Sequence, residues 1–402
     1  MLRPPRSLTA LYPKNKILVI ASLAANKLAD LLISAKTTLP ALLLSLSAPV
    51  WMISWLVPVR ESGALLPQAF IGVLLRRYPA RHQVWRAGMI VQALSVTTML
   101  LSALYLEGVV AGSVVLGSLI LLSLGRAACS LTMKDIQADV ADKGERGDLL
   151  GIASTVSGVL TLCLAVPLIY FKSALGQTVV LMIIALALAG FVAALFILLP
   201  VKTRVSVENG QQDSSGFSFS QFDSVVYRFI AVRGLFVHSA LVAPFFMLEG
   251  DADSQSLLPF YLAAQAAATM LSSLIWGRVA DKSARLTLQL AGILAVLACA
   301  GLLMFSIDSL WWPAGLFFLL SVAHTGVRTG RKTYSLDVKE GQQRTELVAF
   351  SNTAIGIILL LFGATYAALG EVLPFSVVYI MAGFLIAGVL LTLILPQEKA
   401  PD

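Results

Sequence analysis

The chain has 402 residues, of which 58% are hydrophobic and only 13% are charged. A soluble globular protein carries about 25% charged residues, so the composition excludes an ordinary soluble protein. Repeated apolar runs of about 20 residues instead indicate a helical protein that crosses a membrane many times. The net charge of +7 is interpreted as a sign of membrane orientation and not of nucleic-acid binding.

The first half of the chain predicts six membrane spans after a short basic tail. They cover about 17–35, 51–75, 86–106, 109–133, 149–171 and 175–200, and residues 36–50 are expected to form an outer loop. Two lysines before the first span resemble the start of a signal peptide. We expect no cleavage there, because removal of this span would leave the two halves unequal.

The second half predicts six more spans after a polar linker. Residues 201–224 are rich in Ser, Gln and Asp, which is typical of a flexible linker. The spans cover about 225–248, 255–277, 287–306, 310–330, 347–370 and 374–396. The prediction is an all-α integral membrane protein with twelve transmembrane helices, built as an N-terminal bundle (1–200), a linker (201–224) and a C-terminal bundle (225–402).

One charged stretch occurs once in each half. Residues 134–158 match residues 332–356 at a constant offset of 198 residues, with several identical residues and the same order of charges. In each copy a charged loop leads into an apolar helix. The two six-helix bundles are therefore expected to be related by pseudo-symmetry.

The basic residues are unevenly distributed between the predicted loops. If both termini lie inside, the inner loops and tails hold 23 of the 29 Lys and Arg residues, and the outer loops hold two, Lys36 and Lys172. Positively charged loops face the cytoplasm in most membrane proteins. This distribution predicts a multi-pass protein of a prokaryotic inner membrane with both termini in the cytoplasm.

Twelve helices in two parallel six-helix repeats resemble the major facilitator superfamily. The loop 277–285, GRVADKSAR, is similar to a short signature of that family, with a glycine, the pair Asp281–Lys282 and then Arg285. The equivalent loop 72–81, GVLLRRYPAR, keeps the glycine and the basic residues but has Arg76 in place of the acid. The resemblance implies a secondary transporter that works by alternating access, mostly as a monomer.

A second local resemblance lies in the fourth span. The segment 122–130, LSLGRAACS, is similar to the arginine motif of proton-coupled exporters, although Cys129 and Ser130 replace the usual residues. In that family the first, fourth, seventh and tenth spans line a central cavity. The offset of 198 places His324 at the position that matches Arg126, so the resemblance implies that these two residues face each other across the cavity.

Ionisable groups within membrane spans cost about 2.5–3.5 kcal/mol each and are functional candidates by default. The candidates here are Lys27, Asp30, Arg60, Glu61, Arg126, Arg233, His238 and His324. Because the first two spans are neighbours in the family, we expect ion pairs of Asp30 with Arg60 and of Lys27 with Glu61. Such pairs either fix the helix packing or exchange partners during a transport cycle.

Each candidate also has a structural interpretation. Arg126 either binds the solute or a coupling ion, or forms a structural pair with Glu61. His324 either titrates in the cavity or is a hydrogen-bonded core histidine. Asn26 and His238 form a secondary pair of positions, one in each half, and Arg233 lies either in the cavity or with its charge at the membrane surface.

Further charged residues lie at the inner surface, and the resemblance implies that they act as conformational latches. They are Asp139, Arg146, Asp281, Arg285, Asp337 and Arg344. The alternative is that they belong to ordinary solvated loops.

The functional prediction is secondary active transport of a small solute. Proton coupling is expected, sodium is the alternative ion, and the arginine motif favours export. The alternative within the class is an uptake permease for a small organic anion or zwitterion, and the alternative from another class is a non-transporting sensor or assembly factor. We expect no enzymatic activity, metal, cofactor or nucleic-acid partner, because no nucleotide-binding motif, paired acids or metal spacing is present.

Overall fold

The computed structural model describes residues 12–76, 78, 80–141, 146–175, 178–203, 224–249, 254–305, 307, 309–337 and 341–396. Regular structure in these residues is entirely helical. The side chains of Arg146, Asp337 and Arg344 and most of the predicted linker lie outside this description.

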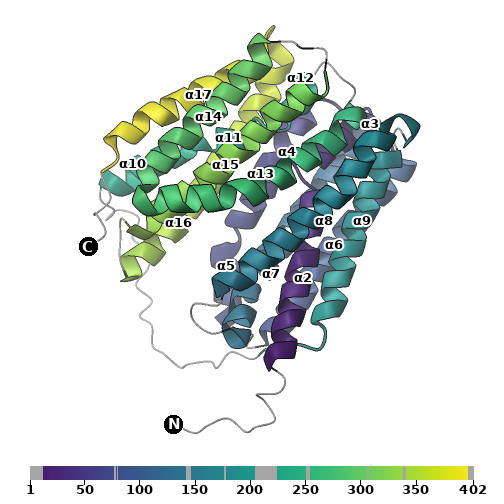
Figure 1. Cartoon of the computed structure of the whole chain (residues 1–402), viewed down its shortest axis with the longest axis vertical. Coiled ribbons are helices and arrows are strands. Elements are labelled where there is room, and N and C mark those ends of the chain that lie inside the picture. The colour runs from purple at the N-terminus through teal and green to yellow at the C-terminus, as the bar shows by residue number, and fades with distance from the viewer. Residues whose placement is uncertain are drawn as a thin grey trace.

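The helices before the linker form the first lobe. They are α2 (Tyr12–Leu32), α3 (Thr38–Ser45), α4 (Trp51–Leu65), α5 (Gln68–Arg76), α6 (Arg81–Tyr105), α7 (Gly108–Val140), α8 (Arg146–Leu175) and α9 (Thr178–Leu198). Figure 1 shows α6, α8 and α9 on the right side of the molecule. The helix α7 continues about seven residues beyond the predicted end of its span, so much of the expected charged loop is helical.

The helices after the linker form the second lobe. They are α10 (Ser224–Phe236), α11 (His238–Leu241), α12 (Phe245–Glu249), α13 (Ser254–Lys282), α14 (Ala284–Met304), α15 (Trp311–Asp337), α16 (Gly341–Val372), α17 (Val378–Leu391) and the 3₁₀ helix η2 (Thr392–Ile394). In Figure 1, α10, α14 and α17 lie on the left.

Eight helices in the described residues are long and apolar enough to cross a membrane. They match the third to ninth and the eleventh predicted spans. The other four segments are interrupted, shorter or more charged: α2 contains Lys27 and Asp30, α4 has 15 residues with Pro58 inside, α15 contains Arg328 and Arg331, and α17 has 14 residues. The total of twelve spans stays a prediction.

The chain is interrupted where the first predicted span ends, and the outer loop expected at residues 36–50 is partly helical. Instead of a loop after residue 35, the chain makes a turn at residues 33–37 and continues as α3, of which Thr38 to Leu43 are buried. Lys36 therefore lies in the turn within the bundle and not in an outer loop. The seventh predicted span is broken in a similar way, into α10, α11 and α12.

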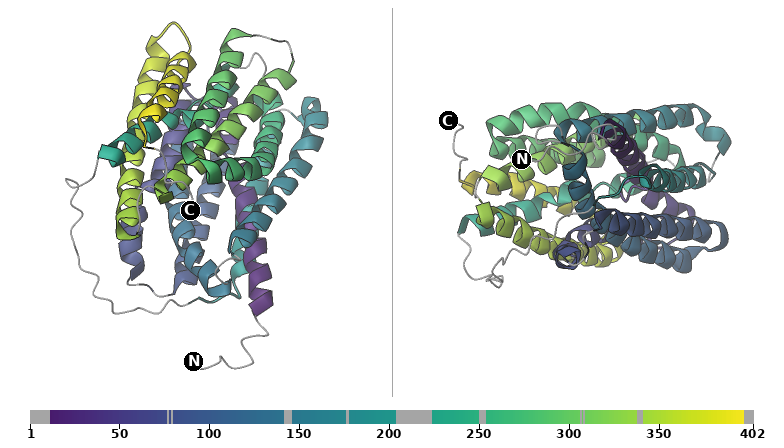
Figure 2. Two further views of the ribbon diagram at one scale, coloured as in Figure 1. Left: turned by 60° about the vertical axis from the view of Figure 1, so that its left-hand side comes forward. Right: turned by 90° about the horizontal axis from the view of Figure 1, so that it is seen from below.

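The two lobes meet along two seams, α4 against α16 and α8 against α13. Figure 2 shows α4 and α5, in purple and blue, running alongside the yellow-green α16. Small residues allow this approach, because Gly356 packs on Leu66, Gly363 on Pro58 and Gly158 on Met270. Ser62 also donates a hydrogen bond across the seam to the carbonyl oxygen of Gly356 at 2.9 Å.

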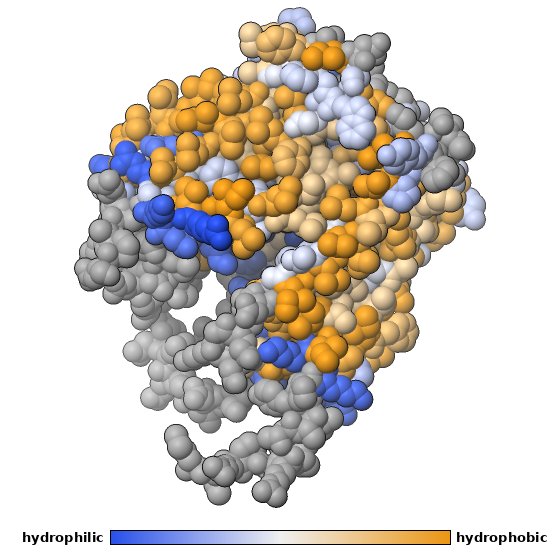
Figure 3. Space-filling view, in the orientation of Figure 1, coloured by the Kyte–Doolittle hydropathy of each residue, from blue (hydrophilic) through white to orange (hydrophobic). Residues whose placement is uncertain are grey.

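The two ends of the bundle differ. We call the end that carries the start of α2, the end of α5 and the start of α10 the linker end, and the opposite end, which carries α3 and α12, the far end. At the far end the lobes touch through α3 with α13 and α11 with α4. Toward the linker end, Figure 3 shows a hollow between the lobes, while orange apolar residues cover much of the outer surface.

Candidate functional site

A cavity of about 270 Å³ lies between the two lobes. The first lobe supplies most of its polar wall through α2, the turn before α3, α4, α7 and α8, and the second lobe contributes α13 and α15. Its charged and polar lining residues are Lys27, Asp30, Ser34, Lys36, Arg60, Glu61, Arg126, Ser154, Ser157, Gln265, Thr269, His324 and Arg328.

Asp30 forms the centre of an arginine cluster in this wall. Its Oδ1 lies 2.6 Å from Nη2 of Arg60, and its Oδ2 lies 3.5 Å from Nη2 of Arg126. The predicted pair of Asp30 and Arg60 is therefore present. Arg126 pairs with Asp30 and not with Glu61, and 39% of its side chain is exposed. The guanidinium of Arg126 thus has donors left for a group in the cavity.

A close helix contact positions Arg126. A Cβ atom added to Gly125 would lie 2.8 Å from the carbonyl oxygen of Gly88, and the converse substitution would be equally tight. The helices α6 and α7 therefore approach each other at these two glycines, which fixes the face of α7 that carries Arg126. Cys129, one turn further along α7, is buried against α6 and accepts a hydrogen bond from Gln92 at 3.3 Å.

Lys27 does not form the predicted pair with Glu61. Its ammonium donates to the carbonyl oxygen of Leu150 at 3.1 Å and to the hydroxyl of Ser154, both on α8. Among the described residues, Glu61 has no ion pair within 4 Å. The charged group that acts on it most strongly is Lys36, followed by Arg126 and Arg328.

Three further basic residues at the centre were not among the sequence candidates: Lys36, Arg328 and Arg331. None of them has a salt bridge within 4 Å to another described residue. The tenth predicted span ended near residue 330, at the position of Arg328 and Arg331, but α15 continues to Asp337. They follow His324 by four and seven residues, which is the spacing of one helix face, and this periodicity was the available signal.

His324 lies on the wall of the main cavity, as Arg126 does. Its Nδ1 is 3.1 Å from the hydroxyl of Ser239, which itself donates to the carbonyl oxygen of Phe236 at 2.9 Å. Because the serine hydrogen is already used, we assign the proton of His324 to Nδ1. Its Nε2 is then an acceptor.

His238 is a core residue of the second lobe. It is fully buried, its Nδ1 lies 2.7 Å from the carbonyl oxygen of Leu235, and its Nε2 lies 2.7 Å from the hydroxyl of Tyr366. Both ring nitrogens are therefore used in hydrogen bonds, which favours the structural interpretation. Asn26 does not line the main cavity, and its Oδ1 is buried without a hydrogen-bond partner in the described structure.

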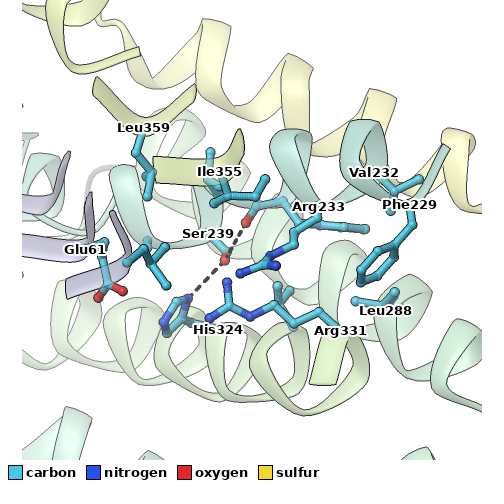
Figure 4. A pocket seen from close by; sticks show the side chains of 15 residues that line it. Glu61, Phe229, Val232, Arg233, Ser239, Leu288, His324, Arg331, Ile355 and Leu359 are labelled. Atoms are coloured by element: carbon cyan, nitrogen blue, oxygen red, sulfur yellow. Dashed lines mark hydrogen bonds between the residues drawn. The ribbon is translucent and has the colours of Figure 1, made fainter. Parts of the chain in front are cut away.

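Arg233 is buried in the second lobe and lines a smaller, separate pocket (Figure 4). It donates to Ser351 at 2.5 Å and to Asn352 at 2.8 Å, so its charge is not at the membrane surface. Asn352 and Ser351 thereby connect α16 to α10. Gln265 likewise accepts a hydrogen bond across the lobes from Ser34 at 3.3 Å.

At the linker end, two arginines bind carbonyl oxygens at helix ends within their own lobe. Arg285 donates to Leu393 and Leu395 at 2.9 and 3.0 Å, and Arg86 of the first lobe donates to Leu199 at 2.6 Å. These contacts join the start of α6 to the end of α9 in the first lobe, and the start of α14 to the chain after α17 in the second lobe. Each arginine therefore connects two helices of the same lobe and not the two lobes.

An ion pair that was not predicted also lies at the linker end. Arg81 Nε is 2.8 Å from Oδ2 of Asp135 and connects the start of α6 to α7. Asp139 and Asp281 are exposed near the ends of α7 and α13. The latch role of Asp139, Arg146, Asp281, Arg285, Asp337 and Arg344 stays a prediction, and three of these side chains lie outside the described structure.

No metal site with three or more His, Cys, Asp or Glu side chains occurs within the described part of the chain. No family model and no curated protein matches the sequence. The structure, however, is similar to the nucleoside transporter NupG in a mutant form, with a TM-score of 0.71, 10% identity and coverage of 95% of this chain and 99% of that chain.

A second similar structure is a bacterial homologue of the iron transporter ferroportin in an outward-facing state. Its TM-score is 0.60 at 15% identity, with coverage of 95% of this chain and 98% of that chain. At such low identity these similarities establish the fold alone. The chain is a multi-pass integral membrane protein that shares the overall fold of these two transporter structures.

Proposed function

We propose that this chain, which has a transporter fold, moves a small anionic solute across the membrane through the cavity between its lobes. The observation that carries the proposal is the excess of positive charge around that cavity. Five cations, Lys27, Lys36, Arg60, Arg126 and Arg328, line it together with two carboxylates, Asp30 and Glu61.

The energetic argument rests on the cost of unpaired charge within a membrane protein. An uncompensated buried charge is strongly destabilising, so charged groups at membrane depth normally pair with each other or with a ligand. Asp30 already compensates Arg60 and in part Arg126. Lys36 and Arg328 have no such partner among the described residues, and a bound anion supplies the missing charge.

The size of the cavity favours a small solute. Pockets that bind drug-sized ligands have volumes of about 300–1,000 Å³, and this cavity, at about 270 Å³, lies below that range. Guanidinium groups offer planar pairs of donors that suit carboxylates and phosphates. A small carboxylate or phosphate ester therefore fits better than a drug-sized compound.

The geometry of the two lobes supports alternating access. They touch at the far end, and the hollow between them lies toward the linker end. Rocking of the lobes about the α4–α16 and α8–α13 seams would close that hollow and separate the far ends. From the excess of basic residues in the predicted inner loops, we propose that the linker end faces the cytoplasm of a prokaryotic cell.

Proton coupling is part of the proposal, and His324 and Glu61 are the groups that would carry the proton. Both line the main cavity, and Nε2 of His324 is left as an acceptor by the contact of Nδ1 with Ser239. Two six-helix bundles, a monomeric carrier and a preference for export stay predictions from the sequence.

The experiment is a flux assay in membrane vesicles of both orientations, which reports uptake and export alike. Succinate, phosphate and glycerol 3-phosphate are compared with glycerol and putrescine, and the internal pH is recorded at the same time. We expect a flux of at least one anion that is accompanied by a change in pH and is lost in Arg126→Gln. Flux of glycerol or putrescine alone would contradict the proposal, and a protein that moves none of a broader panel would be assigned to the non-transporting class.

A further inference from the structure

The second lobe contains a small pocket that the proposed solute pathway does not use. Its accessible volume is about 20 Å³, and it lies among α10, α15 and α16, with Glu61 of α4 at one side. Two guanidinium groups, those of Arg233 and Arg331, point into it (Figure 4). Much of the remaining wall is apolar, with Phe229 and Leu288 among its residues.

Arg233 is a deeply buried cation with neutral partners. Only 9% of the residue is exposed, and its terminal nitrogens donate to the side chains of Ser351 and Asn352. Its Nε is buried without a hydrogen-bond partner in the described structure. The charged group that acts on it most is Arg331, which has the same sign. Among the side chains that the structure describes, Arg233 therefore has no counter-charge within ion-pair distance, and its Nε has no hydrogen bond.

Arg331 increases this imbalance. It has no ion pair within 4 Å to any side chain that the structure describes, and it also lies in the field of Arg328. Glu61 is the opposite charge that acts on it, but from a distance beyond that of a salt bridge. Two guanidinium groups in an apolar pocket repel each other strongly, because the local dielectric constant is low. Such an arrangement requires a negative group between them.

We infer that a single chloride-sized anion binds in this pocket between Arg233 and Arg331. A site needs about 10–15 Å³ of accessible volume to hold one water molecule, so a pocket of about 20 Å³ accepts one small ion and excludes phosphate or a carboxylic acid. The unused Nε–H of Arg233 and the donors of Arg331 supply its hydrogen bonds. The apolar wall strengthens the attraction, because it keeps water away from the ion.

The pocket borders the main cavity, from which an ion would enter it. Glu61 and His324 line both spaces, so the two are neighbours. The carboxylate of Glu61 is the one group of the described chain that competes for this role, because it lies at the same boundary. The inferred site is separate from the solute cavity, since Arg126 and Arg328 line only the larger space.

The test measures the thermal stability of the purified full-length protein while chloride replaces gluconate at constant ionic strength. Wild-type protein is expected to gain about 1–2 °C in melting temperature at tenfold the dissociation constant, in a saturable manner. Bromide should act as chloride does, and sulfate should not. The gain should disappear in Arg331→Gln and persist in Arg278→Gln, which removes an exposed arginine outside both cavities.

Two further variants keep the result interpretable. If Arg331→Gln does not fold, Arg331→Lys retains the charge and should weaken the chloride effect at least threefold. Equal melting temperatures in chloride and gluconate, an equal gain with sulfate, or a full chloride response in Arg331→Gln would each overturn the inference. A chloride response that appears only in Glu61→Gln would also overturn it, because the carboxylate would then be the native occupant.

Discussion

The cluster around Asp30 makes an asymmetric prediction about stability. Asp30 has two arginine partners, whereas Arg60 is 4% exposed and has Asp30 as its ion-pair partner in the described structure. Asp30→Asn therefore leaves a buried guanidinium without its ion-pair partner in the described structure. Arg60→Met leaves Asp30 beside Arg126 at 3.5 Å, so its carboxylate keeps one cation.

The magnitudes follow from the behaviour of broken buried ion pairs. Removal of one partner of such a pair costs about 3–5 kcal/mol, whereas replacement of both partners by apolar groups is often neutral. Asp30→Asn is expected to cost about 3 kcal/mol or more. Arg60→Met should cost less, about 1–2 kcal/mol, because Arg126 compensates the remaining carboxylate. The double variant should be more stable than Asp30→Asn alone.

The assay is a double-mutant cycle, with the free energy of unfolding measured in mixed micelles as the denaturing detergent is increased. Ser113→Ala, an exposed change on α7, controls for effects of purification. Equal losses in the two single variants would refute the asymmetry. Additive losses in the double variant would refute the ion pair itself, because uncoupled residues give additive changes.

Three further predictions test packing, solute binding and proton binding. Gly125→Ala should lower the free energy of unfolding by about 1–3 kcal/mol, because its Cβ would meet a backbone oxygen at 2.8 Å. The control is Gly117→Ala on the same helix, which should be tolerated because its Cβ would meet nothing within 4 Å. Equal losses of stability in the two variants would contradict the close helix contact at Gly125. Lys36→Met should leave the melting temperature unchanged or higher, because Lys36 has no ion pair among the described residues. The KM for the transported anion should rise at least tenfold. An unchanged KM would show that Lys36 does not contact the solute. His324→Gln should change the pH dependence of flux. His238→Phe should lower only the melting temperature, because both ring nitrogens of His238 already make hydrogen bonds. If His238→Phe alters the pH profile and His324→Gln does not, His238 and not His324 would be the proton-binding residue.

Much of the helical organisation could be predicted from the sequence. The apolar runs located eight helices that qualify as spans, and the repeat at an offset of 198 placed Arg126 and His324 on equivalent helices that line one cavity. The interruptions could not be predicted in the same way. The first span was expected to end near residue 35, where the structure has a turn at residues 33–37, but the buried helix α3 that follows was expected to be an outer loop. Lys36 therefore moved from a predicted loop into the cavity.

The candidate site was predicted less completely than the fold, and the reason is geometric. Asp30 and Arg60 pair as expected, but Lys27 reaches the α8 carbonyl of Leu150 and not Glu61, because the order of neighbouring helices decides which residues meet. Arg328 lies at the very end of the tenth predicted span and was not recognised as a candidate, because basic residues at the end of a span usually lie at the membrane surface. In this structure the helix continues, since the arginine faces the polar cavity and not lipid.

The central claim is that anions cross the membrane through the cation-rich cavity. The most direct measurement is the flux of labelled succinate, phosphate and glycerol 3-phosphate into proteoliposomes that contain wild-type protein, Arg328→Gln or Arg278→Gln. The account predicts saturable flux of at least one of these anions, a loss of at least tenfold in Arg328→Gln and full activity in Arg278→Gln, whose exposed side chain lies outside the cavity. An anion flux that Arg328→Gln leaves unchanged, or a flux confined to neutral and cationic solutes, would contradict it.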